Sequence, residues 1–396
     1  MQTSQTRKRG RRRAREVRTT LTGWFILAGL LILWSATGSV VAVVLGEGIP
    51  GPDDRVLPEG PAGPVQPGEV IRIGVLANRG EAIAHEEWDP TVAYLNRTLA
   101  PARFVIIPLD FNATPTAVKR HDISFIAANP SLYTYLEYFG LAQRIATLQV
   151  PGDPDPQAVF GGVIITRADR DEISSLRDIR GKRFAAVDPN SLGGWHAAWA
   201  VLLTEGIRPE EDLASLDFLA THDAVVMAVL SGAADAGTIR SSQLERMEKE
   251  GLIHRSDIRI LHDQKERYPA YPYLLSTDLY PEWPFAMVTG TDHALSRDVA
   301  VALLMMDAND PAAVAVHGAG WAVPQDHTRV HELLRQLQFP PYETYGKPTI
   351  REVINQYWQT ILGIIAGILI LSFLLAYTWR TKRTLSHALI RITESE

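Results

Sequence analysis

Hydrophobic and polar positions divide the chain into two uncharged apolar stretches and a long body of mixed periodicity. Residues 21–45 carry no charged side chain, and neither do residues 353–379. About 20 consecutive apolar residues cross the hydrocarbon core of a bilayer. The second stretch ends on both sides in aromatic residues of the kind that line bilayer interfaces, namely Tyr357, Trp358, Tyr377 and Trp379. The pattern predicts transmembrane helices at 21–45 and 357–379.

A cleaved signal peptide is the alternative for residues 21–45, because a signal peptide also follows a basic N-terminus. The apolar region of a signal peptide usually has about 7–15 residues, and this stretch is longer. A small-residue site near Ala42 keeps the alternative open. We expect a retained membrane anchor.

Basic residues gather outside both apolar stretches. Residues 1–18 have eight Lys or Arg and one Glu, and residues 380–396 have a net charge of +2. The positive-inside rule then predicts cytoplasmic tails at 1–20 and 380–396. We expect a bacterial inner-membrane protein with two spans, cytoplasmic termini and a periplasmic main domain.

The segments next to the two spans differ in composition. Residues 46–69 contain six Gly and six Pro, which is typical of a linker. Residues 346–356 form a short connector that runs almost directly into the second span. Residues 70–345 remain as the folded body.

The body alternates between strand-like and helix-like patterns. Strands are predicted at 70–76, 103–109, 123–127, 163–166, 183–187, 215–219 and 259–261. Helices are predicted at 88–99, 132–139, 194–205, 223–230 and 241–249. This alternation predicts an α/β fold with mostly parallel sheets. The length favours two lobes around a cleft, with lobe 1 at 70–165 and 270–345 and lobe 2 at 166–269.

Charge and cysteine content exclude several functions. The formal net charge is −6, and removal of the two basic tails leaves −6 − 7 − 2 = −15 on residues 19–379. Nucleic acid binding by the body is therefore not expected, because the phosphate backbone requires a basic surface. Absence of cysteine excludes disulfides and thiolate metal sites. His327 and His331 are spaced i, i+4, but the motif of zinc proteases needs a histidine four residues after His331, where this sequence has Arg335. We predict no metal, cofactor or catalytic residues.

Polar groups that open helices follow several predicted strands. Residues 128–131, 188–195 and 220–223 each lie between a strand and a helix. Ligands in open parallel sheets bind beyond the carboxyl ends of the strands. Helix N-termini expose unpaired N–H groups and a partial positive charge, so several that meet at one cleft can hold an anion.

This order of segments resembles the phosphonate-binding-protein-like family of periplasmic binding proteins (type 2). The matching segments are IGVLANRG, the Asn-Pro-x-Leu-Tyr after the third strand, GGVIITRAD, LRDIRGKRFAAVDPNSLGGW, THDAVVMAVLSGAADAG and LYPEWPF. The resemblance covers residues 70–345 and is closest to the extracytoplasmic sensor of tetrathionate-type sensor histidine kinases. It implies a two-lobed fold flanked by two transmembrane helices.

The resemblance also implies ligand contacts, first from Asn129, Ser191, Gly193, Thr221 and His222. Further candidates are Arg79, Tyr133, Trp195 and Asp235. Several have a structural alternative: an N-cap and turn for Ser191 and Gly193, a capping or core position for His222, a solvated surface position for Arg79, core packing for Trp195 against Trp199, and turn formation for Asp235.

The expected function is recognition of a small oxyanion, such as a sulfur oxyanion or a phosphonate, with signalling across the membrane. The 17 residues after Trp379 contain no kinase domain, so the sequence is compatible with a truncated kinase or with a split sensor whose partner is a separate histidine kinase. The alternative is a membrane-tethered substrate-binding component of an ABC-type uptake system, which would pair with transporter subunits. Gly363 and Gly367 form a small-xxx-small pattern that would suit a homodimer of the second span.

Overall fold

The computed structural model describes residues 69–152, 154–343, 345–346 and 350–393. The predicted first span at 21–45, the tail 1–20 and the linker 46–69 lie outside these residues, apart from Glu69. The tail end at 394–396 lies outside them as well.

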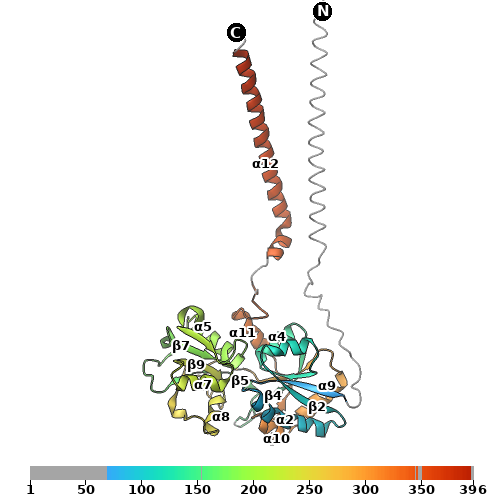
Figure 1. Ribbon diagram of the computed structural model, residues 1–396, viewed down its shortest axis with the longest axis vertical. Coiled ribbons are helices and arrows are strands. Elements are labelled where there is room, and N and C mark those ends of the chain that lie inside the picture. The colour runs from blue at the N-terminus through green and yellow to red at the C-terminus, as the bar shows by residue number, and fades with distance from the viewer. Residues whose placement is uncertain (1–68, 153, 344, 347–349, 394–396) are drawn as a thin grey trace, which may run out of the picture. The chain divides into compact units, whose positions relative to one another are not determined.

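The first lobe is built on a six-stranded sheet of order β13-β4-β12-β3-β1-β2. Its strands are β1 (Val70–Leu76), β2 (Arg103–Leu109), β3 (Phe125–Ala127), β4 (Ala142–Leu148), β12 (Pro284–Val288) and β13 (Trp321–Ala322). The helices of this lobe are α2 (Glu81–Thr98), α3 (Ala113–Lys119), α4 (Pro130–Tyr138), α9 (His293–Leu304), α10 (Pro311–Ala315) and α11 (Thr328–Gln336). Figure 1 shows α2, α9 and α10 near β2 and β4.

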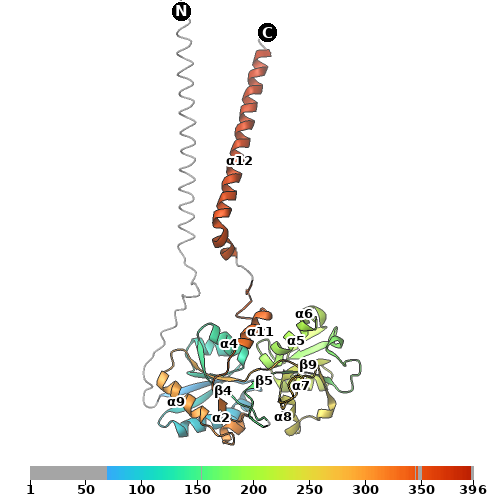
Figure 2. The same ribbon diagram turned by 180° about the vertical axis from the view of Figure 1, so that it is seen from behind.

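The second lobe is built on a five-stranded sheet of order β10-β6-β9-β7-β8. Its strands are β6 (Gly162–Arg167), β7 (Arg183–Ala186), β8 (Ser215–Phe218), β9 (Ala236–Arg240) and β10 (Ile258–Leu261). Its helical elements are η1 (Leu176–Ile179), η2 (Leu192–His196), α5 (Ala197–Thr204), α6 (Pro209–Asp212), α7 (His222–Leu230), α8 (Gln243–Lys249) and η3 (Arg255–Asp257). Figure 2 shows α5, α6, α7 and α8 grouped around this sheet.

The chain passes from one sheet to the other between β4 and β6 and returns between β10 and β12. A short antiparallel ribbon of β5 (Val159–Phe160) and β11 (Tyr280–Pro281) joins the two crossing segments. The predicted division after residue 165 is displaced, because β6 already begins the second sheet at Gly162.

The expectation of mostly parallel sheets is wrong. β1 is parallel to β2 and β3, and β7 is parallel to β8 and β9. However, β12 is antiparallel to β3 and β4, and β6 is antiparallel to β9 and β10. The reason is the crossing itself: β6 and β12 each enter their sheet directly from the other lobe, without the crossover helix that a parallel strand needs.

Apolar side chains of alternating strand positions and helix faces form one large core in lobe 1 and two smaller ones in lobe 2. Phe104, Phe125, Phe285 and Leu95 are fully buried in the first. Closely packed sheets hold the strand ends at fixed positions, which is what a binding site between the lobes requires.

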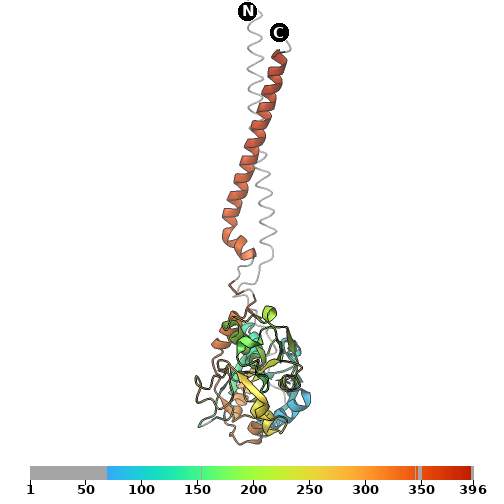
Figure 3. The same cartoon turned by 90° about the vertical axis from the view of Figure 1, so that its left-hand side faces the viewer.

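A single long helix, α12 (Ile350–Thr393), follows the lobes in sequence (Figure 3). It contains 44 residues, which at a rise of about 1.5 Å per residue gives a length of about 66 Å. Within the described residues it is the one helix long and apolar enough to cross a membrane, from Val353 to Ala388. The predicted span at 357–379 lies inside it.

Candidate functional site

Three helical elements begin where strands of the two sheets end, as the sequence predicts. The Asn129 side-chain oxygen accepts hydrogen bonds from the backbone N–H groups of Ser131 and Leu132 at 2.9 and 3.3 Å, and it caps α4. Ser191 Oγ accepts from Gly194 N at 3.1 Å at the start of η2.

The third cap opens α7. Thr221 Oγ1 accepts from Ala224 N at 3.2 Å. Short polar side chains are placed at these positions because they satisfy the first, otherwise unpaired N–H groups of each helix. In α4 the first turn has no N–H group left over, because Pro130 has none, Asn129 Oδ1 accepts from the next two residues, and Tyr133 N donates to Asn129 O.

Contacts between the lobes bring these ends together. Ser131 Oγ in lobe 1 and His196 Nδ1 in lobe 2 lie 2.8 Å apart, which joins the start of α4 to η2. Within lobe 2, Arg240 N donates to His222 Nδ1 at 3.2 Å, which joins the end of β9 to the start of α7. Asn129, Ser191, Gly193 and the 221–222 pair therefore belong to one region between the sheets.

Gly193 is held tightly in this region. A Cβ atom at this position would lie 2.8 Å from Phe160, 2.9 Å from the Arg240 side chain and 3.0 Å from the Gly161 carbonyl oxygen. The backbone of η2 forms a turn of π-helix here, in which His196 N donates to Ser191 O at 2.9 Å. Single π-turns occur often at functional sites, and glycine is required at position 193 for close packing.

His222 offers this region an uncharged hydrogen-bond donor. His222 is 3% exposed, and burial together with the nearby Arg240, Arg79 and Arg246 lowers its pKa to about 3. The ring is therefore neutral at pH 7, and because Nδ1 accepts a hydrogen bond, its proton is on Nε2. Nε2–H is then a donor.

The Asn129 amide is a second donor. Asn129 is 4% exposed, and Nδ2 has no hydrogen-bond partner. A buried donor without a partner costs about 1–3 kcal/mol, so such a group in a native protein needs an explanation. An anion between the lobes would accept from it.

Arg79 serves another purpose than the predicted ligand contact. Its guanidinium donates to Asp223 from Nε at 3.0 Å and to Glu250 from Nη1 at 3.2 Å, and the side chain is 4% exposed. Although burial opposes its charge, the two carboxylates raise the pKa of Arg79. Because Arg79 follows β1 while Asp223 and Glu250 belong to lobe 2, the group holds the lobes closed.

A second ion pair supports the closed arrangement. Arg246 of α8 lies 2.8 Å from Glu87 of α2 and 2.9 Å from Glu250. Hydrogen bonds from Arg79, working against burial and helped by Arg246, lower the pKa of Glu250 to about 2. Two arginines, one from each lobe, therefore share one carboxylate.

The other three candidates do not join the strand-end region. Tyr133 is buried in lobe 1, where its hydroxyl donates to Glu137 at 3.0 Å. Trp195 is stacked on Trp199 at 5.5 Å in the lobe 2 core, as the packing alternative had it.

Asp235 lies at the opposite end of its sheet. It precedes β9 and accepts hydrogen bonds from Arg183 N at 2.9 Å and from Arg170 Nη1 at 2.9 Å. The hydrogen bonds from Arg183, against a smaller effect of burial, lower the pKa of this carboxyl group. Asp235 therefore fixes the turn before β9, as the alternative role of turn formation predicts.

The sequence analysis missed His196 and the buried pair of Arg240 with Glu282. Glu282 is completely buried, its Oε1 lies 2.5 Å from Arg240 Nη2, and its Oε2 accepts from Trp283 N at 3.0 Å. An acidic residue inside the aromatic segment LYPEWPF is the signal that could have indicated a buried ion pair.

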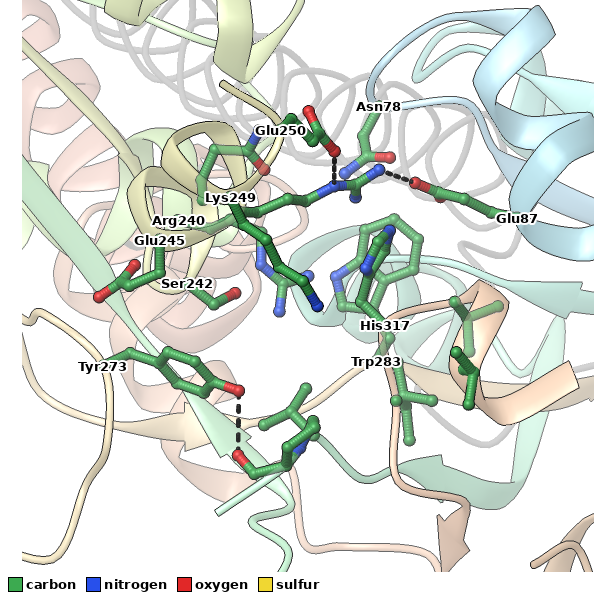
Figure 4. A pocket seen from close by; sticks show the side chains of 18 of the residues that line it. Asn78, Glu87, Arg240, Ser242, Glu245, Lys249, Glu250, Tyr273, Trp283 and His317 are labelled. Atoms are coloured by element: carbon green, nitrogen blue, oxygen red, sulfur yellow. Dashed lines mark hydrogen bonds and ion pairs between the residues drawn. The ribbon is translucent and has the colours of Figure 1, made fainter. Parts of the chain in front are cut away.

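Two cavities border this region. The larger, of about 680 Å³, takes its lining from both lobes, including Asn78, Trp88, Arg240, Trp283 and His317. Figure 4 shows Lys249 and His317 pointing into it.

The smaller cavity, of about 330 Å³, is lined by Ser131, Asn190 and Phe339 among others. None of the nine predicted residues lines either cavity. In the described part of the chain, no group of three His, Asp or Glu side chains could hold a metal ion.

Comparisons with known proteins agree with this architecture. The profile described as "ABC transporter, phosphonate, periplasmic substrate-binding protein" matches residues 73–332, about two thirds of the chain. The tetrathionate sensor histidine kinase TtrS of Salmonella typhimurium is 32% identical over 309 residues, which cover 78% of this chain and 50% of the kinase.

Two further relatives bear on the fold. The phosphate-import protein PhnD of Mycolicibacterium smegmatis is 29% identical over 101 residues, which cover 24% of this chain and 30% of that protein. The chain thus spans half or less of the curated relatives described here. The structure of PhnD1 from Prochlorococcus marinus in complex with methylphosphonate matches with a TM-score of 0.55 and 15% identity, covering 68% of this chain and 98% of that one. The chain belongs to the family of phosphonate periplasmic substrate-binding proteins.

Proposed function

We propose that the chain is a membrane-anchored receptor that binds a small oxyanion between its lobes and passes the bound state across the inner membrane. The observation that carries the proposal is the meeting of α4, η2 and α7 at one place, with the unpartnered Asn129 Nδ2 beside them. The ligand contacts proposed are those of Asn129, Ser191, Gly193, Thr221 and His222.

The chemistry of these groups favours an anion without requiring a cationic side chain. The starts of η2 and α7 contribute N–H groups and partial positive charge, α4 contributes partial positive charge, and the neutral His222 and Asn129 contribute two further donors. The guanidinium of Arg79 is already taken by Asp223 and Glu250. Sulfur oxyanions, phosphate and phosphonates all carry several oxygens on one sulfur or phosphorus atom, and these oxygens can accept hydrogen bonds from such donors.

Membrane anchoring rests on α12 and on the charge pattern of the chain. An apolar stretch of this length, followed by Arg380, Lys382 and Arg383, fits a span with a cytoplasmic end. The proposed topology has a second span at 21–45, which places residues 70–345 in the periplasm. A histidine kinase would take the output, as the relation to the tetrathionate sensor kinase suggests.

A membrane-tethered component of an ABC-type uptake system is the second candidate. The family match favours it, since that family serves transporters. Such a component hands its ligand to transporter subunits and needs no coupling of its lobes to α12. A receptor does need that coupling.

Thermal unfolding of the full chain in detergent tests the binding function. The panel is tetrathionate, thiosulfate, sulfite, phosphate, phosphite and methylphosphonate. A ligand at 100 times its Kd stabilises the native state by about 2.7 kcal/mol, which is a readable shift in Tm. We expect at least one of these anions to raise the Tm.

A double variant assigns the binding to the strand-end region. Ser191→Ala with His222→Asn should remove the ligand-induced shift. The same two changes at the exposed positions Ser231 and His254 of lobe 2 are the control and should leave it intact. Equal ligand shifts in both double variants would place the ligand elsewhere.

A further inference from the structure

Exposed aromatic side chains gather on lobe 1 where α4 packs against α11. Among the described residues of the two lobes, four Phe, Tyr or Trp side chains are exposed, and three of them lie here, namely Tyr138, Phe139 and Tyr345. They are 43%, 49% and 56% exposed. Apolar residues scattered singly over a surface need no explanation, but a group of exposed rings in one place indicates an interaction site.

Ring contacts join these side chains into one surface. Phe139 packs edge-on against Tyr138 at 5.1 Å between ring centroids, and Tyr138 packs edge-on against the buried Tyr342, also at 5.1 Å. Tyr342 lies 6.0 Å from Tyr345, and Phe139 lies 5.0 Å from Tyr135. We call the exposed rings of Tyr138, Phe139 and Tyr345 the aromatic patch, which Tyr135 and Tyr342 support.

Two cations flank the aromatic patch. The guanidinium of Arg335 lies 4.9 Å from the ring centroid of Tyr342 and 5.4 Å from that of Tyr345. Lys119 Nζ lies 5.9 Å from the ring centroid of Tyr135. Aromatic rings with a polar edge are enriched at membrane–water interfaces, and nearby Lys and Arg are attracted to lipid phosphates. The composition therefore suits the headgroup layer of a bilayer.

The aromatic patch is tethered close to the apolar part of α12. Tyr345 precedes Ile350, the first residue of α12, by five residues, and the apolar stretch begins at Val353. Five residues span at most about 18 Å when fully extended, and the three helical steps from Ile350 to Val353 add about 4.5 Å. Tyr345 therefore lies within about 23 Å of Val353, whatever path the chain takes between them.

This tether is short compared with the domain that it holds. A folded domain of the size of residues 70–345 has a radius of gyration of about 19 Å, so its width is well above 23 Å. The headgroup layer extends about 5–8 Å beyond the hydrocarbon core. With α12 across a membrane, the bilayer surface is therefore within reach of the aromatic patch.

We propose that the aromatic patch docks on the headgroup layer of the membrane that α12 enters, with Arg335 and Lys119 next to the lipid phosphates. The inference rests on the proposed membrane anchoring and assigns a lipid partner to a surface of lobe 1. Three rings are too few to bind a membrane firmly from solution. The tether makes docking an intramolecular step at high effective concentration, so weak contacts are enough.

The test measures lipid contact at single introduced cysteines, in the full chain in liposomes. A fluorescent label is quenched by lipids that carry a nitroxide on the headgroup, and the sequence has no native cysteine to compete for the label. Glu343→Cys gives the patch label, at an exposed position between Tyr342 and Tyr345. Glu86→Cys gives the reference label on α2, which Figures 1 and 2 show at the end of lobe 1 opposite α4 and α11.

We expect the headgroup nitroxide to quench the patch label more strongly than the reference label. Tyr138→Ser with Phe139→Ser should lower quenching of the patch label to the level of the reference label. Val301→Ser with Met305→Ser is the matched control, because it removes two exposed apolar side chains at the end of α9, and it should leave the quenching unchanged. Tyr345→Ser repeats the test at the tether if the first double variant does not fold.

Two results would overturn the inference directly. One is equal quenching of the patch and reference labels, and the other is quenching of the patch label that survives the loss of the rings. A patch label that is shielded from iodide in water but not quenched by lipid would show that a protein surface, such as a second copy of this chain, covers the rings. That outcome refutes membrane docking as well.

A third label separates docking from the anchoring on which it rests. Ile368→Cys places a label inside the apolar stretch of α12, where a nitroxide in the middle of the acyl chains should quench it. If it is not quenched, anchoring fails and docking fails with it. If it is quenched while the patch label is not, anchoring stands and docking alone is refuted. The oxyanion screen is independent of these results, because Asn129 and the aromatic patch lie at opposite ends of α4.

Discussion

The two roles assigned to Asn129 can be separated by one pair of substitutions. Its side-chain oxygen caps α4, whereas its Nδ2 is buried without a partner and is proposed to donate to the ligand. Asn129→Ala removes both groups. Asn129→Ser keeps a capping oxygen and removes the amide donor, because serine is as good an N-cap residue as asparagine.

The expected magnitudes follow from these contacts. Loss of an N-cap costs about 0.5–2 kcal/mol, so Asn129→Ala should have a free energy of unfolding about 1 kcal/mol below that of Asn129→Ser, or a Tm about 2–4 °C lower. Without ligand both variants also lose the unpartnered amide donor, so Asn129→Ser should be no less stable than the unchanged chain. A hydrogen bond to a charged group contributes about 1.5–3 kcal/mol, so both variants should bind the anion about 10- to 100-fold more weakly.

The assay combines unfolding and titration of the full chain in detergent. Urea unfolding gives the stability of each variant, and isothermal titration with the anion identified in the thermal screen gives its Kd. The informative outcome is a serine variant that is stable and weak in binding. If Asn129→Ser were to bind the anion as tightly as the unchanged chain, the Nδ2 contact would be refuted, whatever the alanine variant does.

Three further predictions concern the same region. Burial lowers the pKa of both His222 and His196 to about 3 in the folded protein, against about 6.5 in the unfolded chain. Between these pH values the unfolded chain binds more protons than the folded protein, so the free energy of unfolding decreases as the pH falls below 6.5. Each histidine should lower the free energy of unfolding by about 2 kcal/mol at pH 5. His222→Asn should therefore make the midpoint of urea unfolding depend less steeply on pH, and an unchanged slope would contradict the prediction. Gly193→Ala should lower the free energy of unfolding by about 1–3 kcal/mol, because the new methyl group meets Phe160 and the Gly161 carbonyl oxygen. A variant as stable as the unchanged chain in urea unfolding would contradict this and show that η2 can move. Asp235→Asn should lower the free energy of unfolding by about 2 kcal/mol, because the hydrogen bonds from Arg183 and Arg170 become weaker. The Kd for the anion should stay within twofold of the unchanged chain, and a large loss of affinity would indicate that Asp235 contacts the ligand.

The sequence alone determined the elements with strong local signals. The alternating, β-branched pattern at Val70–Leu76 predicts that strand to the residue, because period-2 patterning buries Ile71 and Ile73 on one face. The strand predicted at Arg103–Leu109 also has the observed bounds. The caps at Asn129, Ser191 and Thr221 were also predictable, since a short polar residue between a strand and a helix satisfies the first helical N–H groups. The long apolar stretch of α12 needed only composition.

Tertiary structure decided what each of these side chains meets. The sequence cannot show that Arg79 reaches Asp223, 144 positions away, or that Ser131 meets His196 across the lobes, because such partners depend on the packing of two separate sheets. Tertiary structure also makes β6 and β12 antiparallel to their neighbours, since the direction of a strand depends on the lobe from which the chain arrives. The contact of Phe339 with His196 is likewise fixed by the approach of lobe 2, and no local pattern encodes it.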